Sequence, residues 1–220
     1  EVIEAINQQD KALLCEELGD VLMQVVFHAQ MEAEEGSFTF ENVADGVCKK
    51  LIERHPHVFG EVEVTGSEEV LRNWDDIKKR SKGQTSQTET MLSVPRELPA
   101  LMRATKVQKK AAKVGFDWPD ISGAVDKLYE ETSELSGAIE SGSEEEIAEE
   151  LGDLLFSAVN VSRFVGCDAE EALTAATDKF MRRFACVEEK ARERGLKLEE
   201  LSLSELDALW DEAKLDLLSK

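Results

Sequence analysis

The sequence predicts an all-α protein built from two helical repeats. Glycine, proline and helix-capping residues divide it into amphipathic segments with a helical period. The alternation of β-branched residues that marks strands is nearly absent. The segment EELGD occurs at 16–20 and again at 149–153, and an apolar run follows it both times. Together these observations predict duplicated helical hairpins that form domains resembling four-helix bundles.

Nine helices are expected, at 1–7, 10–35, 39–55, 67–82, 100–113, 122–141, 143–165, 168–194 and 202–218. Two of them begin with the pattern of a capping box, Ser143 with Glu146 and Ser202 with Glu205. Only Ser-Gly-Ser separates the sixth and seventh helices, so this pair is predicted to fold back as an antiparallel hairpin.

The repeats define the expected domains. Residues 1–82 form the first repeat, the polar and proline-marked stretch 83–99 is a linker, and residues 100–220 form the second repeat. The chain opens with EVIEAI, without methionine, in what reads as the last turns of a helix. We therefore expect the opening turns of the first repeat to precede residue 1.

Composition limits the function classes. The 220 residues, 42% of them hydrophobic, can bury a core for one or two domains. A net charge of −21 argues against direct binding of nucleic acid, and it means that divalent cations would have to bridge a phosphate ligand to the protein. Short apolar runs and the lack of a basic-then-apolar leader predict a cytoplasmic protein without a membrane span. The four cysteines lack C-x-x-C spacing and are expected to be reduced thiols.

Four acidic residues are placed symmetrically about the hairpin turn at Gly142. Glu134 and Glu150 lie eight residues before and after it, and Glu131 and Asp153 lie eleven residues before and after it. Antiparallel helices rise equally from their turn, so each pair should lie at one height. Each helix presents its two acids at i and i+3, on one face. The four carboxylates are therefore predicted to converge.

A metal site is the favoured interpretation of this convergence, with Glu130 as a flanking fifth candidate. The 47 acidic residues make solvated i, i+3 pairs common, which is the alternative. However, Asp153 enters a mainly apolar run, where a charge loses hydration and needs a cation or a shifted pKa. Gly19 and Gly152, which are unfavourable in helices, suggest close approach of another helix. An all-oxygen ligand set suits Mg²⁺ or Mn²⁺.

Histidines contribute little to this interpretation. None lies at E-x-x-H spacing from these acids, which weakens a ferritin-like di-iron alternative. His55 and His57 are expected to be structural, and His28 to be a core histidine on an apolar helix.

Basic and aromatic residues recur in both repeats, four positions apart. The pairs are Lys50 with Arg54 and Trp74 with Lys78 in the first repeat, and Lys179 with Arg183 and Trp210 with Lys214 in the second. Such pairs suit phosphate contacts and an aromatic surface for a base. They are equally typical of ordinary charged faces and a packing tryptophan.

The chain resembles the MazG family of nucleoside triphosphate pyrophosphohydrolases, specifically its two-repeat members. The family motif E-E-x-x-E with E-x-x-D stands here as Glu130, Glu131 and Glu134 with Glu150 and Asp153. The stretches RHPHVFG at 54–60, LPALMRATKVQKKAAKVGFDW at 98–118 and KFMRRF at 179–184 resemble that family too. In the first repeat, the visible motif positions are Glu1, Glu17 and Asp20.

The resemblance implies a dimeric helical bundle and Mg²⁺-dependent hydrolysis of a nucleoside triphosphate to the monophosphate and pyrophosphate. Glu131, Glu134, Glu150 and Asp153 would hold the metal, and Glu130 would orient the attacking water or complete the coordination. Lys179, Arg183 and Lys214 would contact phosphates or sugar, and Trp210 the nucleoside.

The second repeat is expected to be the working site, because its motif is complete, and the first to be chiefly structural. The potential site of the first repeat comprises Glu1, Glu17, Asp20, Lys50, Arg54, Trp74 and Lys78. Two alternatives stay open: a non-catalytic helical module for dimerisation or partner binding, and a narrower diphosphatase acting on dUTP or dCTP.

Overall fold

The computed structural model describes residues 1–60, 66, 70, 73–74, 77 and 83–218. Helices dominate these residues and none of them lies in a strand, which confirms the all-α prediction. The elements are α1 (Val2–Gln8), α2 (Lys11–Glu34), α3 (Phe40–Arg54), α4 (Pro56–Phe59), α6 (Gln87–Leu92), α7 (Ala100–Ala112), α8 (Ile121–Ser141), α9 (Glu144–Phe164), α10 (Ala169–Glu193), the 3₁₀ turn η1 (Leu198–Glu200) and α11 (Leu203–Leu218).

Most helix ends lie within one or two residues of the sequence prediction. The expected helix at 67–82 falls mainly outside the described residues. Three short elements were not predicted: α4, which begins at Pro56, the turn η1, and α6. Helix α6 lies inside the expected linker, where Ser86 and Glu89 form a reciprocal capping box.

The capping boxes expected at Ser143 and Ser202 differ in outcome. Ser202 and Glu205 accept hydrogen bonds from each other's backbone N–H. Ser143 accepts from the Glu146 N–H, but the Glu146 carboxylate accepts instead from the Ser141 hydroxyl at 2.9 Å. Only half of the box at the start of α9 is therefore formed, because the Ser143 N–H donates to the Ser141 hydroxyl and that hydroxyl donates to the Glu146 carboxylate.

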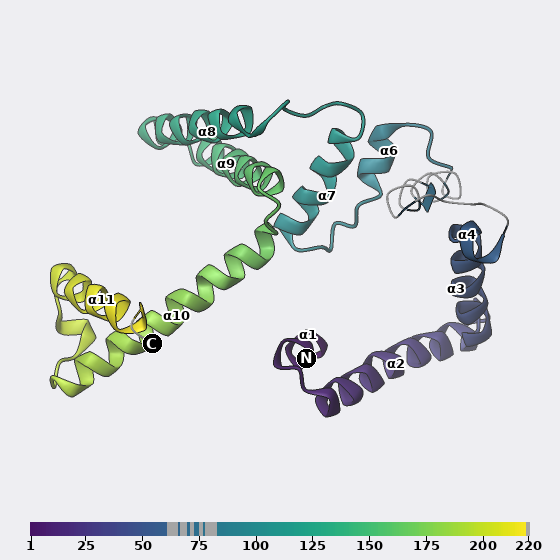
Figure 1. Cartoon of the computed structure of the whole chain (residues 1–220), viewed down its shortest axis with the longest axis horizontal. Helices are drawn as coiled ribbons and strands as arrows, with labels where there is room; N and C mark the ends of the chain where they lie inside the picture. The colour runs from purple at the N-terminus through teal and green to yellow at the C-terminus, as the bar shows by residue number, and fades with distance from the viewer. Residues whose placement is uncertain (61–65, 67–69, 71–72, 75–76, 78–82, 219–220) are drawn as a thin grey trace. The chain divides into compact units, whose positions relative to one another are not determined.

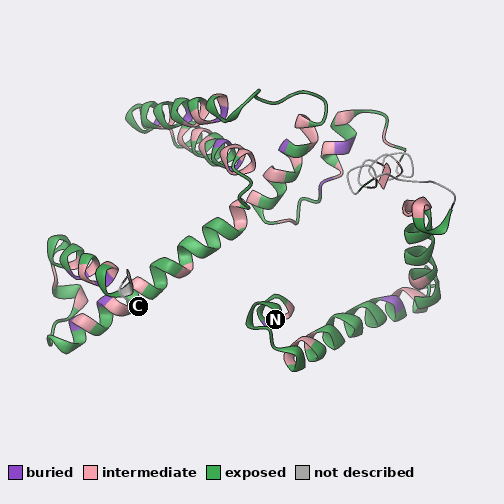
Figure 2. Ribbon diagram, viewed as in Figure 1, coloured by how far each residue is buried: buried purple, intermediate pink, exposed green. Residues whose placement is uncertain are grey.

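The described chain separates into two units, 1–85 and 86–220. In the first unit, α1 folds back on α2, and α2 contacts α3 (Figure 1). Ala29 is the only buried residue of α2, and the rest of this apolar helix is open to solvent or only partly covered (Figure 2). The prediction that His28 lies in a core was wrong, since its side chain is exposed beside Phe27. Within the first unit, α1 and α3 leave most apolar side chains of α2 exposed.

In the second unit, α8 and α9 pack along each other as an antiparallel hairpin (Figure 1). Helix α7 packs against α9, and α6 packs against α7. Helices α10 and α11 form a second pair around a small core of Val187, Ala191, Leu209 and Ala213. The division into repeat, linker and repeat stays a prediction.

Among the described residues, every helix is too short or too polar to cross a lipid bilayer.

Candidate functional site

The α8–α9 hairpin positions the acidic residues of the second repeat. Asp120 caps α8 by accepting from the Ser122 N–H, and Ser143 caps α9. Gly142 joins the helices at φ +77°, a conformation that glycine adopts without steric cost. Because the turn is tight, residues equally distant from it on the two helices lie opposite each other.

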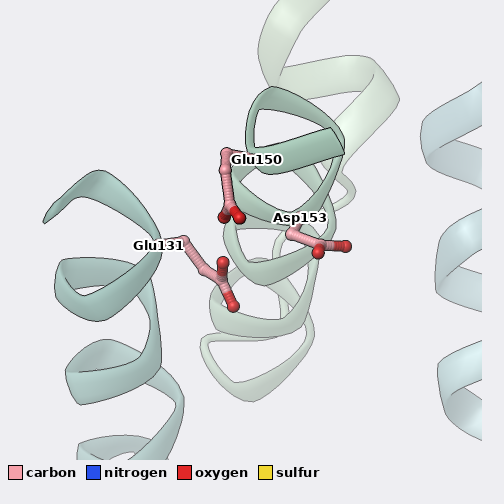
Figure 3. A group of neighbouring side chains, drawn as sticks. All are labelled: Glu131, Glu150 and Asp153. Atoms are coloured by element: carbon pink, nitrogen blue, oxygen red, sulfur yellow. The ribbon is translucent and has the colours of Figure 1, made fainter. Parts of the chain in front are cut away.

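Three carboxylates meet across this hairpin. Glu131 on α8 and Glu150 and Asp153 on α9 each offer an oxygen, and these oxygens lie within 4.8 Å of one another (Figure 3). Glu131 is only 4% exposed, Glu150 is partly buried and Asp153 is exposed. The group therefore has a buried floor and an open side through which a ligand can enter.

Glu134 lies outside this closest group but adds its charge to it. Partial burial raises the pKa of the Glu150 carboxyl above its usual range, and the negative charge of Glu134 is the next cause, followed by Glu131 and Asp153. The negative charges of the other three predicted metal ligands, Glu134, Glu131 and Asp153, thus all act on Glu150. Glu134 is more exposed than Glu131.

Lys127 is part of the site, and the sequence analysis missed it. Its Nζ lies 2.7 Å from Glu131 Oε1 and 2.8 Å from Glu130 Oε1. These hydrogen bonds raise the pKa of Lys127 above its usual range, the bond to Glu130 contributing most. The signal was present, since Lys127 is four residues before Glu131, but such pairs are common on helices. Glu130 is thereby held beside the cluster by an ion pair.

The donor set fits a hard divalent cation. Its ligand atoms are carboxylate oxygens, which Mg²⁺ and Mn²⁺ prefer. Partial burial and then repulsion by the neighbouring acids raise the pKa of Glu150, so positive charge is favoured at this position. Lys127 already supplies one cation next to the most buried carboxylate. Among the described residues, this is the one cluster of three or more potential metal ligands.

The predicted substrate-binding residues lie on the other helix pair of the second unit, α10 and α11. The Arg183 guanidinium lies 5.9 Å from the centre of the Trp210 ring, and Phe180 packs on the same tryptophan with ring centres 5.1 Å apart. Lys214 forms an ion pair with Asp211 at 2.5 Å, and Lys179 is exposed. Arg183 and Trp210 are thus brought together, but neither they nor the two lysines belong to the carboxylate group.

The first repeat has a partial counterpart of each feature. Partial burial raises the pKa of Glu17, and the charges of Glu1 and then Asp20 raise it further. The Arg54 guanidinium lies 5.3 Å from the centre of the Trp74 ring, as Arg183 lies over Trp210. Lys50 is exposed on α3, and Lys78 lies outside the described residues.

Neither glycine of the repeated segment has another helix close to it within its own unit. A Cβ atom at Gly19 or at Gly152 would meet no other atom within 4 Å. The expectation of close approach is therefore wrong within each unit, because the helix that packs on α2 or α9 does not reach the glycine.

Two stretches of the chain match a known family. The family model described as the MazG nucleotide pyrophosphohydrolase domain matches residues 1–59 and 122–187. The second match contains all four carboxylates together with Lys127, Lys179 and Arg183, and the first contains Glu17 and Asp20.

Several curated proteins are similar over nearly the whole chain. A nucleoside triphosphate pyrophosphohydrolase of Escherichia coli strain K12 is 44% identical over 97% of this chain and 82% of its own length. The nucleoside triphosphate pyrophosphohydrolase/pyrophosphatase MazG of Thermotoga maritima is 45% identical over 97% of this chain and 81% of its own length. The uncharacterized protein YabN of Bacillus subtilis is 50% identical over 97% of this chain, which covers 44% of that protein. With two matches to the family model and these relatives, the chain belongs to the MazG nucleotide pyrophosphohydrolase family.

Proposed function

We propose that this protein is a nucleoside triphosphate pyrophosphohydrolase, which hydrolyses ribo- or deoxyribonucleoside triphosphates to the monophosphate and pyrophosphate. The observation that carries the proposal is the cluster of Glu131, Glu150 and Asp153 across the α8–α9 hairpin. Relatives of 44–45% identity over most of the chain bear the name of this activity.

Each acidic residue has a role in this proposal. Glu131, Glu134, Glu150 and Asp153 hold the divalent cation, Mg²⁺ or Mn²⁺. When bound, such an ion coordinates phosphate oxygens, lowers the pKa of a bound water and offsets charge on the leaving pyrophosphate. Glu130, exposed at the edge of the cluster, orients the attacking water. Lys127 holds Glu130 and Glu131 in place through its two ion pairs.

Substrate contacts come from the basic groups of α10 and α11. Lys179, Arg183 and Lys214 bind phosphates or sugar, because the triphosphate needs cations beyond those at the carboxylates. Trp210 contacts the nucleoside beside Arg183. The carboxylates and these residues lie on separate helix pairs, so the complete site depends on how the pairs are assembled.

We infer that the protein assembles as a homodimer. Leucines at equivalent positions of the two repeats, Leu18 and Leu22 on α2 and Leu151 and Leu155 on α9, are 44–57% exposed. Full burial of an exposed leucine side chain stabilises a protein by about 1.5–3 kcal/mol, so covering the exposed half of each leucine contributes roughly half of that. The open surface at Gly152 leaves room for a helix of a second chain.

Replacing Leu155 with glutamate is therefore expected to disrupt the dimer. Wild-type protein should have twice the chain mass in light scattering after size exclusion, and Leu155→Glu should shift towards the chain mass and melt at a lower temperature. Leu203→Glu, at the exposed start of α11, serves as the control and should keep the wild-type mass. A monomeric wild type, or an unchanged mass for Leu155→Glu, would contradict this assembly.

Charge and cysteines bear on nucleic-acid binding and on location. The net charge of −21 opposes binding to nucleic acid, and the exposed free cysteines Cys15, Cys48 and Cys167 fit a reducing cytoplasmic location.

A panel of ribo- and deoxyribonucleoside triphosphates with Mg²⁺ tests the proposal. We expect pyrophosphate from several bases. Turnover of dUTP or dCTP alone would indicate the narrower enzyme. Bound Mn²⁺ without turnover of any triphosphate would indicate a non-catalytic helical module and refute the proposed activity.

A further inference from the structure

Helix α7 is strongly basic in an otherwise acidic chain. Residues 98–116, which contain this helix, include five basic residues and no acidic residue. The rest of the chain carries 21 basic and 47 acidic residues. The sign of the charge on α7 is therefore opposite to that of the protein as a whole.

The basic side chains of α7 form one continuous stripe, called the basic face below. Its members are Arg103, Lys106, Lys109, Lys110 and Lys113. At 3.6 residues per turn, they fall within an arc of about 120°. Gln108 lies on the opposite side of the helix, is only 6% exposed and donates to the Phe156 carbonyl of α9 at 2.8 Å. The basic face is thus turned away from this contact, and all its members except Lys110 are exposed.

Helix stability does not account for the whole basic face. The partial negative charge at the C-terminal end of a helix favours Lys109 and Lys110, which lie in the last turn. Arg103 lies at the end of the first turn, where the helix dipole disfavours a cation. Acidic residues four positions away would stabilise such side chains, but this segment contains none.

Three members of the basic face have charges that the second unit leaves uncompensated. Arg103, Lys106 and Lys109 form no ion pair with any residue that the structure describes. In contrast, Lys127 and Lys190 each bind two carboxylates. The positive charge of these three side chains is therefore available to an anion from solution.

The basic face lies close to the carboxylate cluster. Arg103 precedes Gln108 by five residues and Asp153 precedes Phe156 by three, so each lies within about 8 Å of the α7–α9 contact along its own helix. Electrostatic fields decay over about 8 Å at physiological ionic strength and about 30 Å at 0.01 M. At low ionic strength, the attraction of the basic face extends over the cluster.

We propose that the basic face of α7 guides the anionic substrate to the carboxylate cluster. This inference rests on the proposed function. A nucleoside triphosphate remains negatively charged with one Mg²⁺ bound, and a protein with a net charge of −21 repels it at a distance. A local positive potential beside the cluster offsets this repulsion and increases the rate of encounter. Steering of this kind raises association rates by about 10- to 1,000-fold and weakens with salt.

Reversing the uncompensated charges tests the proposal. The first variant combines Arg103→Glu, Lys106→Glu and Lys109→Glu, and the second carries glutamine at the same three positions. Lysine, arginine, glutamine and glutamate have similar helix propensities, and the three side chains are exposed, so both variants should fold. Lys110 and Lys113 stay unchanged because each has another interaction.

The matched control changes the net charge by the same amount elsewhere. It combines Lys49→Glu, Arg192→Glu and Lys197→Glu, whose side chains are 72–76% exposed and lie outside α7. A loss confined to the basic-face variants would show that the position of the charges matters, because total charge is equal in the control and the first variant.

The measurement is the association rate of a nucleoside triphosphate that carries a fluorescent group on its ribose, mixed with Mg²⁺ and protein in a stopped-flow instrument. At an ionic strength of about 0.02 M, the glutamate variant should associate about tenfold more slowly than wild type, and the glutamine variant about threefold. At about 0.5 M salt, all proteins should agree within about twofold. The control should match wild type within about twofold in both conditions, and kcat should change less than twofold in every variant.

Three results would overturn the guide: equal association rates for wild type and the basic-face variants, a loss that persists in high salt, or an equal loss in the control. The first would leave the basic face to an acidic protein partner. Because association is measured without turnover, the proposed function can fail separately. A wild type that releases no pyrophosphate but associates with this charge and salt dependence would retain the guide and refute the activity. A wild type that hydrolyses triphosphates but associates at a salt-independent rate would do the reverse.

Discussion

Replacing Glu131 with glutamine is expected to lower kcat/KM for every nucleoside triphosphate by about 100-fold or more. Glu131 is the most buried carboxylate of the cluster, and an uncharged amide is a poor ligand for Mg²⁺. Loss of partners that only support metal ligands already costs 10–100-fold, so loss of a ligand itself should reach the upper end of that range. Glutamine has the shape of glutamate, so the fold should survive.

The matched control is Glu140→Gln, an exposed acid on the same helix that lies outside the cluster. It removes the same charge and should leave kcat/KM within about twofold, since surface substitutions have small effects. Circular dichroism should show wild-type helicity for both variants, and titration with Mn²⁺ should show weaker binding for Glu131→Gln alone. Wild-type turnover by Glu131→Gln would remove the cluster from the chemistry.

Glu150→Gln is expected to lower kcat/KM by about 100-fold as well, and to stabilise the metal-free protein at neutral pH. Partial burial and the neighbouring acids raise the pKa of Glu150 in the folded state. Between its usual pKa and this raised value, the folded protein binds more protons than the unfolded chain. The contribution of Glu150 to stability therefore grows as pH falls through the raised pKa, and it is unfavourable at neutral pH without metal.

Thermal unfolding of wild type and Glu150→Gln in EDTA, followed from neutral to mildly acidic pH, tests whether Glu150 destabilises the metal-free protein. The difference in melting temperature should favour the variant at neutral pH and shrink as pH falls. Mg²⁺ should raise the melting temperature of wild type at neutral pH, because it relieves the repulsion, and should raise that of the variant much less. If wild type in EDTA is the more stable protein at neutral pH, the four acids do not repel as described.

The helices could be predicted because their signals are local. The starts of α9, α10 and α11 follow Ser143, Asp168 and Ser202, and each cap appears as a short polar residue before an amphipathic segment. The convergence of Glu131, Glu150 and Asp153 followed from counting residues around one tight turn. In both cases few residues separate the groups concerned, so local geometry determines the outcome.

Features that depend on distant packing were missed or wrong. The hydrogen bond from Gln108 on α7 to the Phe156 carbonyl on α9 joins residues 48 positions apart, and no periodicity predicts such a contact. The pattern around His28 correctly indicated an apolar helix. Such a pattern does not predict whether the surface that covers the helix belongs to the same chain. The contact of Lys127 with the acidic cluster was not predicted, because charged residues are so frequent in this sequence that an i, i+4 pair is uninformative by itself.

The most direct test of the central claim is phosphorus NMR of the products that wild type and Asp153→Asn form from one deoxyribonucleoside triphosphate with Mg²⁺. The account predicts monophosphate and pyrophosphate in equal amounts from wild type, and unchanged substrate with a folded Asp153→Asn variant. Diphosphate and inorganic phosphate from wild type, or undiminished pyrophosphate from the variant, would contradict it.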